Sequence, residues 1–208
     1  MEFTGLLNID KPAGMSSAYA VGGIKRLLPR GTKVGHAGTL DPFATGVLIV
    51  LVGRATRLCE RVMGQPKQYE ATIKLGATTP TLDPTSEEVA MPGAAVASRG
   101  EVEGALARQV GQIEQVPPAF SALHVGGRRA YELARRGQEV ELPARLVTIY
   151  GIEVLEYAWP SVRIRIDCGK GTYIRAVARG LGVALGMGAY LTELRRTRVG
   201  PWTAVGAV

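Results

Sequence analysis

The longest continuous apolar stretch in the chain is Val47–Val52, and Gly53 follows it directly. A helix that crosses a bilayer needs about 20 apolar residues, whereas a fully buried strand needs far fewer. This stretch therefore predicts a strand that is buried on both faces. Two other stretches, Tyr69–Leu75 and Val162–Cys168, alternate apolar with polar side chains. Such alternation is typical of strands with one buried face.

In the segments between these strands, apolar residues recur at the spacing of a helix. Ser16 and Ser17 are candidate N-caps for a first helix that Pro29 ends, and Thr172 is a candidate cap for the last one. Predicted helices cover residues 17–28, 55–63, 102–113, 129–136 and 173–185, further strands cover 146–157 and 190–202, and a loop or hairpin covers 78–93. Because this order lacks regular βαβ repeats, we expect an α+β fold with a mixed, mostly antiparallel sheet flanked by helices.

Composition limits the class of protein and of partner. Hydrophobic residues make up 46% and charged residues 21% of the 208 residues, as in ordinary globular proteins. The N-terminus lacks a basic stretch followed by an apolar one, so we expect a cytoplasmic protein rather than a secreted one. The two cysteines lie far apart in apolar patterns, which indicates free buried thiols. With no CxxC and two widely separated histidines, the sequence predicts no metal site.

The formal charge of +7 points to a polyanionic partner. Many of the cationic residues are arginines in clusters, and for any single pair a solvated surface charge explains the pattern equally well. The clusters are Arg128/Arg129, Arg135/Arg136, Arg163/Arg165, Arg175/Arg179 and Arg195/Arg196/Arg198.

The most informative loop covers residues 35–46 and begins with the letters GHAGTLDP. Its glycines allow unusual backbone angles and close approach of a ligand. Pro42 restricts Asp41 to extended geometry, which holds the carboxylate on a stiff loop and suits a positioned nucleophile. A plain connecting turn is the alternative that the residues alone leave open, since Asp-Pro is a common turn pair.

A second informative stretch, residues 169–175, reads GKGTYIR. It resembles a phosphate loop before a helix, but the GxxxxGK[ST] pattern is absent, which argues against a nucleoside triphosphate. Arg175 falls in the first helical turn, where the helix dipole disfavours a cation. This position predicts a carboxylate partner for Arg175, while a solvated pair with Arg179 on a surface helix is the alternative.

Taken together, these stretches resemble the ordered motifs of TruB-type pseudouridine synthases. Residues 35–42 resemble the catalytic motif of that family. The other matching stretches are DKPAGMSS (residues 10–17), KQYEA (67–71), GKGTYIR (169–175) and LRR (194–196). They follow in family order and cover nearly the whole chain. The resemblance implies the pseudouridine synthase fold and one catalytic domain over residues 1–208.

The resemblance also implies catalytic roles. Asp41 would be the nucleophile, Tyr69 would stack on an extruded uridine and take part in removing its C5 proton, and Arg175 would pair with Asp41. The reaction detaches uracil from C1′, rotates it and rejoins it through C5. It changes no oxidation state and consumes no water, so no metal or other cofactor is implied. Base flipping is required because a stacked base hides its reacting atoms.

Further residues would contact the RNA or support the site. His36 would displace the target base, Leu194 would form an apolar wall, and Lys11 and Tyr173 would support the site or contact RNA. Lys170 would do the same, although a plain turn lysine is an equally good interpretation. One departure from the family pattern is Arg57, where the family has a lysine. The planar guanidinium of arginine replaces the compact ammonium of lysine at this position.

Residues 117–143 help to choose a subfamily. Their letters PPAFSAL (117–123) and YELARRG (131–137) resemble the RNA-gripping thumb of stand-alone bacterial members, with Arg128 and Arg129 as RNA contacts. We therefore expect a monomeric enzyme that needs no protein partner and acts on uridine 55 in the T loop of tRNA. The chain stops near the end of the family's catalytic domain, without the PUA domain of many members.

Two alternatives remain at this point. A protein of the same fold could bind RNA or assist tRNA folding without catalysis, although the joint presence of Asp41, Tyr69 and Arg175 argues against it. A pseudouridine synthase could also act on another RNA. The sequence leaves open whether attack occurs at C6, at C1′ or through a glycal.

Overall fold

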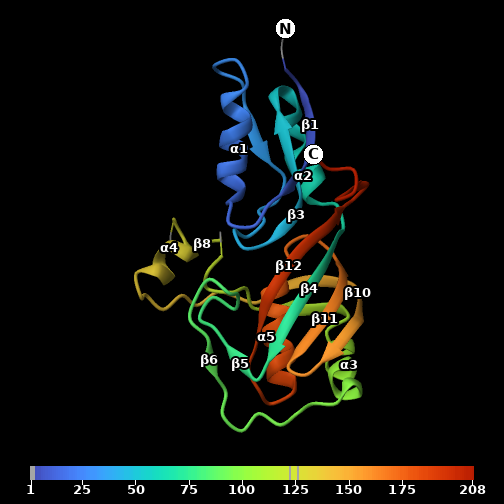
Figure 1. The fold of residues 1–208 in the computed structure, drawn as a ribbon. Helices are drawn as coiled ribbons and strands as arrows, with labels where there is room; N and C mark the ends of the chain where they lie inside the picture. Colours follow the sequence, from blue (N-terminus) through green and yellow to red (C-terminus); the bar gives the residue numbers. More distant parts are fainter. Residues whose placement is uncertain (1–2, 122, 126) are drawn as a thin grey trace. The chain divides into compact units, whose positions relative to one another are not determined.

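The computed structural model describes residues 3–121, 123–125 and 127–208, without the side chains of residues 124, 125 and 129. The chain folds into two compact units, and each is described by itself. The first contains Met1–Glu70 and Leu194–Val208, and the second contains Ala71–Glu193. Figure 1 shows the path of the chain through both. The predicted single domain over residues 1–208 stays a prediction.

In the first unit a mixed sheet is built around strand β3 (Thr45–Val52), which is buried almost throughout. Strand β1 (Gly5–Lys11) pairs with β3 in antiparallel register, and so does the short β2 (Val34–His36). Strand β12 (Ala189–Val199) pairs with β3 in parallel, with Arg196 opposite Gly46. The predicted buried strand is confirmed. Covering β3 on both faces leaves no position for a polar side chain, which is why its sequence is an unbroken apolar run.

Helix α1 (Ser17–Arg26) begins where the sequence predicts, because the Ser16 hydroxyl accepts a hydrogen bond from the Tyr19 backbone N–H at 3.1 Å. It ends two residues before Leu28. The predicted helix over 55–63 is α-helical only in its second half. A 3₁₀ helix, η1 (Gly53–Leu58), passes into the short α2 (Cys59–Met63). Gly53 has φ +60°, and the Thr56 hydroxyl donates to its carbonyl at 2.8 Å, which tightens the first turn.

In the second unit strand β4 (Lys67–Leu75) alternates buried and half-buried residues, as predicted. The sheet order is β12–β4–β11–β10–β7. Here β11 is Ser161–Cys168, β10 is Arg145–Ala158 and β7 is Gly111–Gln115. Both β11 and β7 are antiparallel to β10. The α+β class with a mixed, mostly antiparallel sheet is confirmed.

Two predicted helices of this unit need correction. Helix α3 (Arg99–Ala107) starts in a capping box of Ser98 and Glu101 but does not reach residue 113. Gly111 has φ +107°, and Ile113 of β7 pairs with Val147 of β10, because cross-strand pairing outweighs the helical spacing of Ile113. Helix α5 (Ile174–Ala184) is capped by Tyr173 rather than Thr172, whose hydroxyl donates to the Gly169 carbonyl at 3.2 Å.

The remaining elements are short. The predicted hairpin over 78–93 is formed by β5 (Ala77–Thr78) and β6 (Val89–Ala90). The predicted final strand is divided, because β12 ends at Val199 and β13 (Trp202–Thr203) turns back on it. Within the predicted thumb, β8 (His124–Val125) pairs with β9 (Arg128–Arg129) before helix α4 (Ala130–Arg135), close to the predicted 129–136. Ala122 and Gly126 of that segment lie outside the described residues.

The two cysteines are free thiols, as predicted. Cys168 is buried and Cys59 is half-buried. Burial raises the pKa of the Cys59 thiol. None of the helices in the described part of the chain is long and apolar enough to span a bilayer.

Candidate active site

Asp41 lies on the loop between β2 and β3, and its side chain is half-buried. The Asp41 carbonyl accepts a hydrogen bond from the Ala44 N–H at 3.1 Å. The next carbonyl, that of Pro42, accepts one from the Gly14 N–H at 2.8 Å. These bonds close the turn and tie it to the loop before α1. The carboxylate is therefore carried by a backbone that is fixed on both sides.

Lys11 lies at the end of β1 and is completely buried. Its ammonium donates to the carbonyls of Pro12 and Met15, each at 2.7 Å, and to that of Pro42 at 3.3 Å. Burial lowers the Lys11 pKa to about 8, with Asp41 opposing this shift and Arg196 adding to it. Lys11 thus joins the two motif loops, and its position supports the Asp41 loop rather than reaching outward.

Arg196 of β12 fixes the other side of the same loop and is only 1% exposed. Its guanidinium donates to the carbonyls of Gly38 and Thr39, both at 3.2 Å, and to that of Val47 at 2.7 Å. Gly46 has φ +104°, and a Cβ there would lie 2.2 Å from the Arg196 carbonyl oxygen. Only glycine allows β3 and β12 to come this close.

Ser17 gives a further connection, because its hydroxyl donates to the Leu40 carbonyl and accepts from the Leu40 N–H, both at 2.9 Å. Asp10 and Arg195 form a paired contact at the edge of this region, with distances of 3.0 and 2.6 Å. The side-chain hydrogen bond to Asp10 raises the Arg195 pKa. The motifs at residues 10–17, 35–42 and 194–196 are therefore connected to one another by hydrogen bonds.

The other predicted residues of the first unit occupy ordered positions. Tyr69 lies on β4 and is 7% exposed, and Leu194 lies on β12 and is 6% exposed. His36 ends β2 opposite Val50, and its carbonyl accepts a hydrogen bond from the Cys59 thiol at 3.7 Å. These placements are compatible with the predicted stacking, wall and base-displacing roles, which stay predictions.

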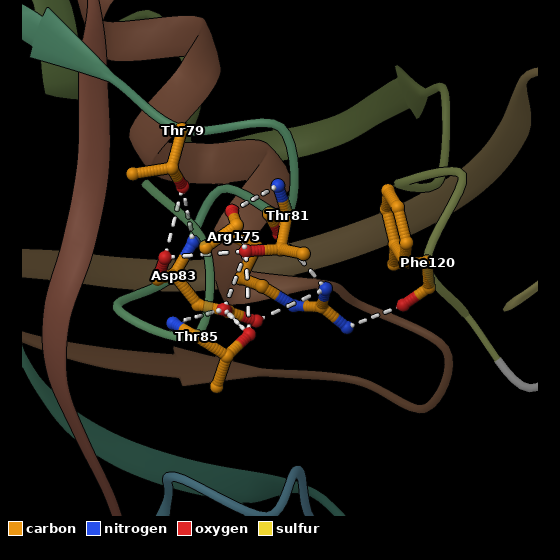
Figure 2. A network of polar contacts seen from close by, with 7 residues as sticks. Thr79, Thr81, Asp83, Thr85, Phe120 and Arg175 are labelled. Atoms are coloured by element: carbon orange, nitrogen blue, oxygen red, sulfur yellow. Dashed lines mark hydrogen bonds and ion pairs between the residues drawn. The ribbon is translucent and has the colours of Figure 1, made fainter. Parts of the chain in front are cut away.

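Arg175 is the centre of a buried polar network in the second unit, which Figure 2 shows. It is 4% exposed and donates to the carbonyls of Thr81 at 3.0 Å and Phe120 at 2.9 Å. Its guanidinium also lies 3.4 Å from the carboxylate of Asp83, which is 5% exposed. Arg175 therefore has a carboxylate partner in Asp83, which is not the Asp41 that the family resemblance implies, and the alternative of a solvated surface pair with Arg179 is wrong.

The loop of residues 79–86 is organised around Asp83 (Figure 2). The Asp83 carboxylate accepts from the Thr81 hydroxyl at 2.6 Å and from the Thr85 N–H at 3.0 Å. Thr79 bonds both the carbonyl and the N–H of Asp83, at 2.9 and 3.0 Å. Leu82 has φ +59°, which is uncommon for a branched residue and shows how strongly this loop is constrained. The network connects Arg175, on helix α5, to the hairpin loop and to the chain at Phe120.

The predicted RNA contacts of the second unit differ in exposure. Lys170 is exposed on the turn before α5, and Arg128 is exposed on β9. Tyr173 is half-buried, and its N–H donates to the Gln115 side-chain oxygen at 2.8 Å. The side chain of Arg129 lies outside what the structure describes. Asp41 belongs to one unit and Arg175 to the other, so their pairing stays a prediction.

Residues 25–174 match the model of the TruB family pseudouridylate synthase (N terminal domain). The chain is 51% identical over 200 residues to tRNA pseudouridine synthase B of Bacteroides fragilis, covering 94% of this chain and 86% of that protein. The chain belongs to the TruB family.

Other relatives agree with this family assignment. Over 201 residues the chain is 51% identical to tRNA pseudouridine synthase B of a Mycobacterium species, and it covers 67% of that protein. A chain in the crystal structure of a Cbf5–Nop10–Gar1 complex matches with a TM-score of 0.72 and 32% identity. The match covers 97% of this chain and half of the other. A chain of an H/ACA RNP bound to a substrate RNA containing 2′-deoxyuridine matches with a TM-score of 0.69 and 31% identity.

Sequence reasoning placed Arg196 in the matching LRR stretch without giving it a role in the Asp41 loop, and it did not single out Asp83. A sequence signal exists for each. Arg196 follows the apolar Leu194 by two residues on one predicted strand. Side chains two apart on a strand point to the same face, so Arg196 is expected on the buried face. Asp83 precedes a proline in a loop rich in threonine, the same Asp-Pro pattern that marks Asp41. Within the described residues, no group of three or more His, Cys, Asp and Glu could hold a metal.

Proposed function

We propose that this TruB family protein isomerises uridine to pseudouridine in tRNA, at position 55 of the T loop, with Asp41 as the nucleophile. The observation that carries the proposal is the Asp41 loop. Its backbone is fixed by Ser17 and by two buried cations, Lys11 and Arg196. The relatives named tRNA pseudouridine synthase B supply the substrate class.

The chemistry needs a nucleophile rather than a cofactor. The C1′–N1 bond breaks, the uracil turns, and a C1′–C5 bond forms. The C5 proton is lost and N1 gains a proton, so atoms and electrons balance without water or a redox partner. A carboxylate that is ionised at neutral pH can attack the uridine directly. A fixed loop lowers the entropic cost of placing that carboxylate against its target.

The surrounding residues would prepare the base. His36 would help to displace the uridine from its stack, and Tyr69 would stack on the extruded ring and take part in removing the C5 proton. Arg175 would pair with the Asp41 carboxylate and favour its charged form. Leu194 would provide an apolar wall, and the buried Lys11 would hold the Asp41 loop.

RNA binding would rest on the exposed cations. Lys170 and Arg128 are exposed, and Arg128 belongs to the thumb-like segment of residues 117–143. Arg129 and Tyr173 would add contacts to the RNA. A thumb of its own would let the protein act as a monomer without a guide RNA or protein partner, in the cytoplasm where tRNA matures.

Asp41→Asn tests the proposal, because it keeps the shape of the side chain and removes the negative charge and the nucleophile. Pseudouridine should fall below detection in an unmodified tRNA transcript under single-turnover conditions, which prevent slow product release from hiding the effect. Binding of the tRNA should persist or tighten, since a negative charge leaves an RNA-facing site. Modified positions are mapped in the transcript, and Glu60→Gln serves as the control for loss of a carboxylate, since Glu60 is exposed on α2.

Three outcomes separate the candidates. Asp41→Asn that forms pseudouridine near the parent's rate would refute the nucleophile assignment. A parent that binds tRNA yet makes no pseudouridine would favour the RNA chaperone alternative. Pseudouridine at another position, or only in another RNA, would replace the T-loop target while keeping the reaction.

A further inference from the structure

A pocket of about 470 Å³ lies on the first unit, next to strand β2, which carries His36. It is bounded by the end of α1, the loop that follows it, β2 and the 3₁₀ helix η1. Its lining consists of Lys25, Gly31, Thr32, Lys33, Val34, Gly35 and Thr56. Two exposed lysines are among these residues and no acidic residue is, which suits an anion.

The sequence around this pocket is strongly one-sided in charge. Residues 11–40 contain no aspartate or glutamate, yet they include Lys25, Arg26, Arg30 and Lys33 within nine positions (33 − 25 + 1 = 9). A solvated face of an ordinary helix usually mixes both signs. No acidic side chain in the described residues pairs with Lys25 or Lys33. The positive potential at the pocket is therefore not neutralised locally.

Structural roles account for only part of this charge. Lys25 and Arg26 lie in the last turn of α1, where cations complement the helix dipole. Arg26 also lies over the Tyr19 ring at 6.0 Å. Lys33 lies seven residues beyond the helix (33 − 26), outside the range of that dipole effect. The side chain of Lys33 has no such structural explanation, and it is exposed at the pocket.

The walls of the pocket are held by hydrogen bonds. The Lys33 carbonyl accepts from the Gly53 N–H at 2.8 Å, which fixes the chain just before β2. The Thr32 hydroxyl donates to the Pro29 carbonyl at 2.7 Å, and the Thr56 hydroxyl donates to the Gly53 carbonyl at 2.8 Å. The lysine backbone positions are thus set before an anion arrives, which limits the entropy that binding must overcome.

We propose that the pocket between Lys25 and Lys33 binds a backbone phosphate of the RNA substrate. This inference rests on the proposed function and adds a contact to it. Gly35 lines the pocket and is followed directly by His36, both on β2. A phosphate held here would fix the RNA backbone beside the residue proposed to displace the base. Phosphate contacts of this kind fix register and orientation without reading sequence.

The test uses the full chain with Lys25→Gln and Lys33→Gln combined and an unmodified tRNA transcript. Affinity is measured by fluorescence anisotropy over a range of salt concentrations. We expect roughly tenfold weaker binding, and the slope of log affinity against log salt should become less steep by about one to two, as loss of phosphate contacts requires. The enzyme concentration for half-maximal single-turnover conversion should rise in parallel. Lys25→Arg with Lys33→Arg should restore most of the affinity.

A matched control removes two exposed cations outside the pocket, Arg61→Gln with Arg108→Gln. If this control weakens binding as much as the pocket variant, the effect is one of net charge and the site is refuted. Unchanged affinity of the pocket variant would also refute it. Displacement of tRNA by inorganic phosphate, in excess of the effect of chloride at equal ionic strength, would make the pocket a free-anion site and overturn the proposal. Because binding is the readout, a parent without synthase activity would defeat the proposed function but not this test.

Discussion

At the scale of single residues, Lys11 shows how a buried charge can organise a loop. Its ammonium takes the place of missing backbone donors for three carbonyls, two before α1 and one directly after Asp41. Charge burial costs free energy, and these hydrogen bonds together with the attraction of Asp41 offset that cost. A surface lysine would leave the three carbonyls to other partners and the loop less defined.

The lowered Lys11 pKa gives a pH prediction. The folded chain releases this proton near pH 8, whereas the unfolded chain keeps it up to the ordinary value of 10.5. Between these values the unfolded state binds more protons, so this residue makes the folded state more stable as pH rises, by up to about 1.4 kcal/mol per pH unit. Urea unfolding of the parent and of Lys11→Met at several pH values isolates the effect. A parent-minus-variant difference that is flat or falling above about pH 8 would contradict it.

At the scale of elements, Arg175 joins three segments that the chain brings in separately. Helix α5 supplies the guanidinium, the hairpin between β5 and β6 supplies Asp83, and the start of the thumb-like segment supplies the Phe120 carbonyl (Figure 2). Low local dielectric makes such a network strong when every member is satisfied and costly when one is lost. The network therefore couples the order of the hairpin to the position of Arg175.

Replacing Asp83 by Ala should reduce the free energy of unfolding by about 3–5 kcal/mol, because it leaves the Arg175 charge buried beside vacated hydrogen bonds. Arg165→Ala is the matched control, since it breaks the exposed pair with Glu153 and should cost no more than about 1 kcal/mol. Chemical denaturation measures both. Equal losses in the two variants would show that the Asp83–Arg175 contact contributes no more than a surface ion pair.

The thumb-like segment gives a second prediction at this scale. Deletion of residues 126–137 removes α4 and the strand pairing of β8 with β9. Ala130 is fully buried and the Tyr131 N–H donates to the Ser121 carbonyl, so some stability should be lost. We expect a larger loss in tRNA affinity, because the segment carries Arg128, Arg135 and Arg136. Anisotropy and urea unfolding compare the two losses, and unchanged tRNA affinity would remove the thumb assignment.

At the scale of the whole molecule, the charge of +7 and the chemistry of the proposed reaction belong together. A protein that acts on RNA must attract phosphates over a wide surface, since backbone contacts supply most of the sequence-independent affinity. An isomerisation that exchanges one glycosidic bond for another needs no electron carrier. In the proposed reaction the cations therefore bind RNA phosphates, and one carboxylate carries out the chemistry.

We expect turnover to survive exhaustive chelation and to need no added nucleotide, because the sequence has neither metal-ligand spacing nor a phosphate-loop motif. The assay follows pseudouridine formation in a prefolded tRNA transcript with EDTA and monovalent salt. Monovalent salt keeps the tRNA folded, which controls for metal that the RNA alone requires. Loss of turnover that only a divalent metal restores would contradict the prediction.

Features whose physics is local could be predicted from the sequence. Six consecutive apolar residues, Val47–Val52, left no choice but a doubly buried strand, and the alternation over Tyr69–Leu75 fixed which face of β4 is buried. The Ser16 cap placed the start of α1 correctly, because a side chain three residues from its partner acts without help from the rest of the chain. The α+β class followed from such patterns, and the TruB family followed from the resemblance of ordered motifs.

Features that depend on distant partners could not be predicted in this way. Ile113 has helical spacing but becomes part of β7, because β10 offers its backbone a ladder of hydrogen bonds. Arg196 reads as one of a surface cluster, yet it is buried against the carbonyls of the Asp41 loop, more than 150 positions away. Asp83 gains its role only where α5 delivers Arg175 to it. Local sequence determines propensity, but the energy of burying a charge depends on which partners the fold brings to it.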